Sequence, residues 1–157
     1  MSDENPLEVV NGGDRLSRRA QIAALEAHML AMDQADKLPV QDMTDHYFAS
    51  GAYVRAMRLP KGVVAVGGIH ATEHICILLQ GVVRITTELG SEVHVAPKIM
   101  VCPPGLKRVA FAIEDAIWAN AHAVGDERDL SAIEQRLIAP SFEALEALYP
   151  NLLKDAD

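Results

Sequence analysis

Two histidines four residues apart in one apolar stretch are the residues best suited to chemistry. Residues 67–77 read GGIHATEHICI. Side chains alternate between the two faces of a β-strand, so His70, His74 and Cys76 would share one face. Two imidazoles four residues apart on a single strand lie too far apart to stack, although a curved sheet can aim both at one point. Imidazole binds metals and titrates near neutral pH, so this pattern predicts metal or substrate contact at His70 and His74.

The segment that carries these residues belongs to a succession of short strands over residues 51–124. Runs such as YVRAMRL, EHICILL and VVRITTEL alternate with turn sequences such as PKG, LGS and PPG. Many short strands separated by Gly and Pro turns are typical of a β-sandwich or closed barrel. The sequence therefore predicts a mainly β domain.

Helical patterns flank this range on both sides. Residues 14–50 begin with an amphipathic helix, for which Asp14 is a candidate N-cap, and continue as a connector. Residues 125–157 contain one or two short helices bounded by prolines. Residues 1–13 are polar, end in Gly-Gly and predict a flexible tail.

The segment GGIHATEHICILLQG resembles the first motif of the cupin superfamily. That motif reads Gly, five residues, His-x-His, three or four residues, Glu, six residues, Gly. When the segment is aligned on Gly81, His74 stands at the position of the Glu and His70 at that of the second His. Gly68 stands where the first His is usual, so the ligand set differs from that of the family.

The turn PPGLKR resembles the second cupin motif, Pro-x-Gly-x-x-His-x-x-x-Asn. Arg108 takes the place of the His, and Ala112 that of the Asn. The resemblance covers about residues 51–124 and implies a single cupin-type (RmlC-like) jelly-roll β-barrel with the flanking helices outside it. The HATEH, PGLKR and EDAIW segments are also similar to small uncharacterised cupin-like proteins of tailed bacteriophages and prophages.

A third metal ligand would have to come from outside the two motifs. In AIWANAHAV, Trp118, Asn120 and His122 share one face of a predicted strand. The cupin resemblance implies that this last strand lies beside the first-motif strand, so His122 would meet His70 and His74. Three imidazoles suit Zn, Fe, Mn, Ni or Co without selecting one of them. Without a third ligand, the histidine pair would serve as hydrogen-bonding and acid–base groups.

Arg108 leaves two interpretations open. On the inner face of the barrel it would be a fixed cation for a carboxylate or phosphate, with Trp118 and Asn120 as further ligand contacts. Alternatively, it would form a structural ion pair with Glu73, Glu88 or Glu114. Lys107 has the opposite parity and is predicted to face solvent.

The two cysteines are predicted to pack in the core rather than to react. Cys76 lies among Ile and Leu, where a thiol has a raised pKa, and Cys102 directly precedes two prolines. Two cysteines make no disulfide framework, and the acidic start MSDENPLEVVNGGD lacks the order of a signal peptide. These observations predict a cytoplasmic protein with free thiols.

Composition excludes several classes of partner. The chain has 157 residues, which suits one domain, and its formal net charge is −8, which would repel a phosphate backbone. Nucleic acid is therefore not expected. Apolar runs are only strand-sized and no basic amphipathic stretch is present, so no membrane partner is expected either.

Three functional hypotheses follow. The first is a small protein that binds a divalent metal, a small anionic ligand, or both, in a histidine-lined barrel pocket. The second is a cupin metalloenzyme, an oxygenase or an isomerase; whether any reaction is catalysed is left open. The third is a non-catalytic, phage-associated interaction or structural protein. A homodimer is expected, with the N-terminal helix packing on the partner or on its own barrel.

Overall fold

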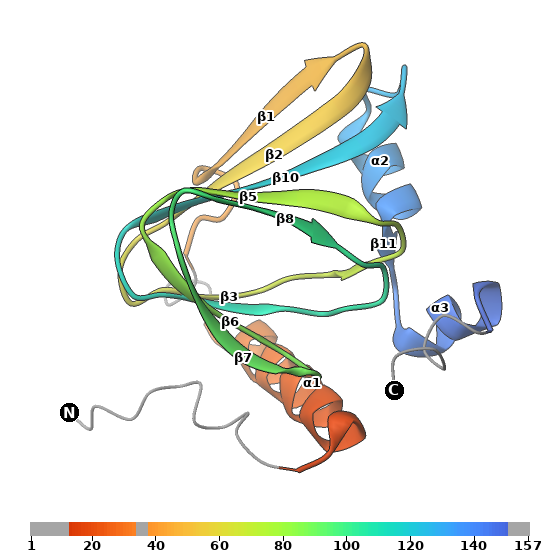
Figure 1. Cartoon of the computed structure of the whole chain (residues 1–157). Helices are drawn as coiled ribbons and strands as arrows, with labels where there is room; N and C mark the ends of the chain where they lie inside the picture. The colour runs from red at the N-terminus through yellow and green to blue at the C-terminus, as the bar shows by residue number, and fades with distance from the viewer. Residues whose placement is uncertain (1–12, 34–37, 151–157) are drawn as a thin grey trace.

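The chain folds as two antiparallel sheets that face each other, with helices outside them (Figure 1). This computed structural model describes residues 13–33 and 38–150. The first sheet has the order β1 (Thr44–Ala49), β2 (Gly51–Leu59), β10 (Ala116–Gly125), β5 (His74–Gln80), β8 (Lys98–Cys102). The second has the order β3 (Val64–Val66), β9 (Val109–Ala112), β6 (Val82–Thr87), β7 (Gly90–Val95).

This strand order is that of a jelly roll. Without the added edge strand β1, each of these two sheets has four strands. Apart from β4 (Ile69–His70), which pairs in a separate two-stranded sheet, successive strands from β2 to β10 alternate between them except at the β6–β7 hairpin. The predicted mainly β, cupin-type fold is therefore confirmed, together with an N-terminal helix and two short C-terminal helices. The predicted connector differs in part, because residues 44–49 pair with β2 along their whole length as strand β1.

The core between the sheets is built from side chains of alternating parity. Cys76 and Leu78 of β5 are fully buried, whereas Leu79 on the opposite face is 56% exposed. The turn between β5 and β6 requires Gly81, which has φ +85° and packs against the backbone of Asp115. A side chain there would be strained and would collide with that backbone.

Helix α1 (Arg15–Ala31) covers the outer face of the second sheet (Figure 1). Asp14 caps it by accepting a hydrogen bond from the Ser17 N–H, as predicted. Ile22 is buried against β3 and β9. The solvent-facing prediction for Lys107 is wrong, because α1 covers this side chain and Glu26 pairs with its Nζ at 2.5 Å. The homodimer stays a prediction.

The C-terminal segment closes one end of the barrel. Helix α2 (Leu130–Leu137), capped by Asp129, leads into β11 (Ile138–Ala139) and then helix α3 (Phe142–Leu148). Strand β11 pairs with β4 (Ile69–His70), so the last elements lie against the first-motif segment. The predicted tail falls outside the described residues except for its final glycine. No helix in the described ranges is long and apolar enough to cross a membrane.

Candidate functional site

Three imidazoles form a cluster at the end of the barrel that β11 closes. The ring centroids of His70 and His74 are 4.1 Å apart. The centroid of His122 lies 5.4 Å from that of His70 and 4.9 Å from that of His74. The expectation that His70 and His74 share one strand is wrong, because they belong to two different strands. His70 ends β4, the chain bends at residues 71–73, and His74 begins β5.

The position of His122 follows from the central place of β10 in its sheet. β10 pairs with β2 on one side and with β5 on the other. His122 therefore lies between Tyr53 of β2, at 6.1 Å between centroids, and His74 of β5. The structure brings together all three histidines that the sequence singled out.

These imidazoles are held neutral. Burial and neighbouring positive groups lower the pKa of His70 to about 2 and those of His74 and His122 to about 4. Arg108 contributes to all three shifts, and Arg55 contributes to those of His70 and His122. The Nδ1 atoms of His70 and His122 are buried without a hydrogen-bond partner in the described part of the chain.

Arg108 lies against the cluster rather than in a structural ion pair. Its Nη2 lies 3.1 Å from Nε2 of His74, and its Nη1 donates to Sγ of Cys76 at 2.9 Å. Within residues 13–33 and 38–150, no carboxylate oxygen lies within 4.0 Å of this guanidinium. Glu88, one of the alternatives considered, instead pairs with Arg15 and Arg19 of α1.

Two buried thiols adjoin Arg108 and His74. The thiol of Cys102, at the end of β8, lies 2.9 Å from Sγ of Cys76, which is 3.4 Å from Nε2 of His74. The hydrogen bond shared by the two thiols, together with burial, raises the pKa of Cys76, whereas the same contact lowers the pKa of Cys102 to about 7. His74, Cys76 and Cys102 offer ligand atoms within 4.8 Å of one another and could hold a metal ion.

This group shares only His74 with the predicted ligand set. Among the described residues, no other group of three His, Cys, Asp or Glu side chains brings its ligand atoms within 4.8 Å of one another. The set His70, His74 and His122 stays a prediction. Parity placed Cys76 on the same strand face as His74, but its apolar neighbours led to the prediction that it packs in the core. The position of Cys102 opposite His74 depends on the pairing of β5 with β8, which the sequence does not state.

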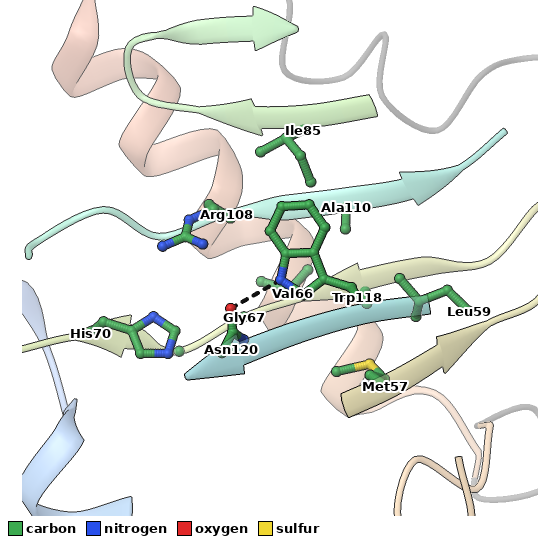
Figure 2. Close-up of a pocket in the computed structure, with 12 residues that line it drawn as sticks. Met57, Leu59, Val66, Gly67, His70, Ile85, Arg108, Ala110, Trp118 and Asn120 are labelled. Atoms are coloured by element: carbon green, nitrogen blue, oxygen red, sulfur yellow. Dashed lines mark hydrogen bonds between the residues drawn. The ribbon is translucent and has the colours of Figure 1, made fainter. Parts of the chain in front are cut away.

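A cavity of about 80 Å³ opens beside the cluster, and Figure 2 shows Arg108 and His70 at one side of it. Trp118 and Asn120 also line it, and the indole Nε1 donates to Oδ1 of Asn120 at 3.0 Å. The remaining wall is largely apolar: Met57, Leu59, Ala65, Val66, Gly67, Gly68, Ile85 and Ala110. All three predicted ligand contacts thus line one cavity.

The missing histidine of the first motif has a steric explanation. A Cβ at Gly68 would lie 2.8 Å from Cγ2 of Ile138 in β11. Any side chain at this position would therefore require the C-terminal segment to move. Gly68 lets β11 approach the first-motif segment, and the barrel end is closed by protein at the place where the family usually has a ligand.

Comparisons with known proteins assign no role to this chain. No protein-family model matches the chain, and no curated protein matches its sequence. Three solved structures illustrate the structural likeness. A cupin superfamily protein from Desulfitobacterium hafniense is 10% identical, with a TM-score of 0.46, and the match covers 59% of this chain and 94% of that one.

The second is an RmlC-like cupin family protein with a double-stranded β-helix fold from Methanocaldococcus jannaschii: 13% identity, TM-score 0.45, 59% and 86% coverage. The third is a cupin-2 domain-containing protein from Shewanella frigidimarina: 12% identity, TM-score 0.42, 63% and 91% coverage. None of the three is described as a phage protein, so that likeness stays a prediction. The strand order itself makes this chain a small protein of cupin-type fold.

Proposed function

We propose that this protein binds a small organic anion, a carboxylate with a short apolar body, in the cavity beside the histidine cluster. The observation that carries the proposal is Arg108, a half-buried cation at the cavity wall with no carboxylate partner in the described ranges. A guanidinium binds a carboxylate through two parallel N–H bonds, which makes Arg108 the recognition group.

The charge balance of the surroundings supports an anion. The three imidazoles are neutral at physiological pH, because their pKa values are lowered to about 4 or less. Arg55 is a second cation close enough to act on His70 and His122, and its Nε is buried without a partner in the described part of the chain. An anion would offset these charges in surroundings where charges interact more strongly than in bulk water.

The size and lining of the cavity support a small ligand with an apolar portion. A volume of about 80 Å³ holds several water molecules, since one needs roughly 10–15 Å³, but is far below the ~300 Å³ of drug-sized sites. The wall opposite Arg108 includes Met57, Leu59 and Ile85. The amide of Asn120 adds a polar contact at the rim.

The proposal is tested by titrating the full chain with acetate, propionate, butyrate and succinate in a calorimeter. We expect saturable binding by the wild type and a loss of about 10-fold or more in Arg108→Gln, because a charge-assisted bidentate contact is removed. Arg136→Gln, on the exposed face of α2, is the matched control and should bind as the wild type does. Equal affinities in Arg108→Gln and the control would overturn the proposal.

A divalent metal on the histidines is the second candidate. Within the described residues, the buried Nδ1 atoms of His70 and His122 have no hydrogen-bond partner, which favours a metal because a buried nitrogen without a partner is costly and a metal would satisfy it. Zn, Fe, Mn, Ni and Co all accept imidazole. Metal analysis of untagged protein, repeated on His70→Ala and His122→Ala, tests it. A wild type without stoichiometric metal, whose melting temperature none of these ions changes, would exclude this candidate.

A further inference from the structure

We propose that His74, Cys76 and Cys102 form a site for a thiophilic metal ion such as Zn²⁺, and that metal binding displaces Arg108 from His74. The metal site rests on the ligand geometry alone. Its link to anion binding rests on the proposed function, because the displaced guanidinium would face the cavity that Arg108 already lines.

Pairing of β5 with β8 places the three ligands. His74 and Cys102 are directly opposed in the antiparallel register, and Cys76 is the next residue of β5 on the same face. All three side chains are therefore on the inner face, and all three residues are buried. Nδ1 of His74 lies 3.2 Å from the carbonyl of Thr72, so Nε2 is the nitrogen left to face the thiols.

The distances fit zinc after a small movement. Two sulfurs bound to one tetrahedral zinc at about 2.3 Å are about 3.8 Å apart, and a sulfur and a nitrogen about 3.5 Å. The Cys76–His74 separation of 3.4 Å already matches, whereas the two sulfurs, at 2.9 Å, must separate by about 0.9 Å. β8 is an edge strand of its sheet, so a movement of Cys102 would disturb the pairing with no strand other than β5.

Arg108 occupies the position that the metal would need. Its guanidinium lies within hydrogen-bond distance of His74 Nε2 and Cys76 Sγ, two of the three ligand atoms, and a guanidinium is always a donor. A metal and Arg108 therefore compete for the same lone pairs. When Zn²⁺ binds, Cys76 and Cys102 each lose a proton to solvent, and the two thiolates neutralise the ion. No electron is transferred, and the net charge of the group does not change.

If the metal displaces Arg108, the loss of this side chain should raise the affinity for Zn²⁺ instead of lowering it. Removing the competing cation in Arg108→Gln should tighten Zn²⁺ binding by about 10-fold, within the range typical of coupled sites. Cys102→Ser should weaken it by more than about 100-fold, since it removes a ligand rather than an outer contact. His94→Gln, on β7, is a matched control outside the group and should leave the affinity unchanged.

The experiment is a Zn²⁺ titration of the full chain under reducing conditions, in competition with a chromophoric chelator, with Co²⁺ as the spectroscopic probe. Thiolate-to-cobalt charge-transfer absorption that disappears in Cys102→Ser is the expected result. If the wild type shows no such absorption, or if wild type and Cys102→Ser bind Zn²⁺ with equal affinity, the metal site is overturned. Zn²⁺ affinity that is unchanged or weaker in Arg108→Gln would overturn the displacement.

Carboxylate titrations with and without Zn²⁺ separate this inference from the proposed function. Binding linkage is reciprocal, so the metal-loaded protein should bind the carboxylate more tightly by the same factor by which the carboxylate tightens Zn²⁺ binding. If neither form binds any carboxylate, the proposed function fails, while the cobalt spectrum still decides the metal site. If both forms bind with equal affinity, only the linkage fails.

Discussion

The two ends of the barrel interior differ in composition although the same strands build both. At one end, Leu78, Trp118 and Met57 face one another across β5, β10 and β2. Four residues further along β10, the same face carries His122 beside Tyr53. One end is an apolar core that borders the cavity through Met57 and Trp118, and the other is a cluster of neutral imidazoles with buried nitrogens that lack partners in the described part of the chain.

The apolar end stabilises the fold, whereas the polar end carries the groups suited to binding. Burial of apolar side chains stabilises the fold, whereas a buried imidazole with a depressed pKa, or a buried nitrogen without a partner, reduces stability. The apolar end therefore supports the polar end. Substitutions at the two ends should differ in which property they change.

The largest expected effect comes from the apolar end. Leu78→Ala should lower the free energy of unfolding by about 2–5 kcal/mol, because it opens a cavity at a fully buried position. Leu79→Ala, at the neighbouring exposed residue, should change it by less than about 0.5 kcal/mol. Urea unfolding measures both. Similar losses in the two variants would contradict the assignment of Leu78 to the core.

Acid should destabilise the protein through the polar end. The folded-state pKa values of His74 and His122 are about 4, below the ~6.5 of an unfolded chain, so the unfolded state takes up protons first as the pH falls. Stability should be fully present above pH 6.5 and decline towards pH 4, by on the order of a few kcal/mol in total. Urea unfolding at pH 7, 6, 5 and 4 measures this decline.

The comparison protein for this measurement is the double variant His74→Gln and His122→Gln, whose stability should depend less on pH in the same range. His28→Gln, on an exposed position of α1, is the control. A double variant with the same slope as the wild type would show that other groups cause the acid destabilisation.

Closure of the polar end should depend on Gly68. Gly68→Ala should destabilise by about 1–3 kcal/mol, because its Cβ would meet Cγ2 of Ile138 at 2.8 Å. Gly67→Ala is the matched control, since its Cβ would meet only the Arg108 carbonyl at 3.6 Å. Adding Ile138→Ala should remove part of the Gly68→Ala penalty. Strict additivity in a double-mutant cycle would argue against this contact.

The smallest expected effect reports on the boundary between the two ends. Trp118 is the only tryptophan of the chain, lines the cavity and donates to Asn120. A carboxylate entering the cavity should shift or quench its fluorescence, because the environment of the indole changes. The signal should saturate with the calorimetric affinity and weaken in Arg108→Gln. A fluorescence response without saturation would indicate that the ligand does not enter this cavity.

The strand pattern was predictable because it depends on local sequence. Alternating parity, the turns at Gly81 and residues 103–105, and the helix cap at Asp14 all depend on near neighbours in the chain. Parity also predicted that Trp118 and His122 share one face of their strand, and the cupin resemblance implied that this face points inward. The strand at residues 44–49 was not anticipated, because its pairing with β2 depends on a hairpin that a connector-like composition does not indicate.

By itself, the sequence predicted the fold class and the three candidate histidines, and it left Arg108 open between the inner face of the barrel and a structural ion pair. Only the tertiary structure decided that His70 and His74 contact each other, that Cys102 faces His74, and that Arg108 lies within hydrogen-bond distance of two of the three atoms that would bind a metal. The physical reason is the distance along the sequence between the residues that interact. Strand parity and turns follow from adjacent residues, whereas the chain bend at residues 71–73 and the β5–β8 register depend on segments distant in sequence.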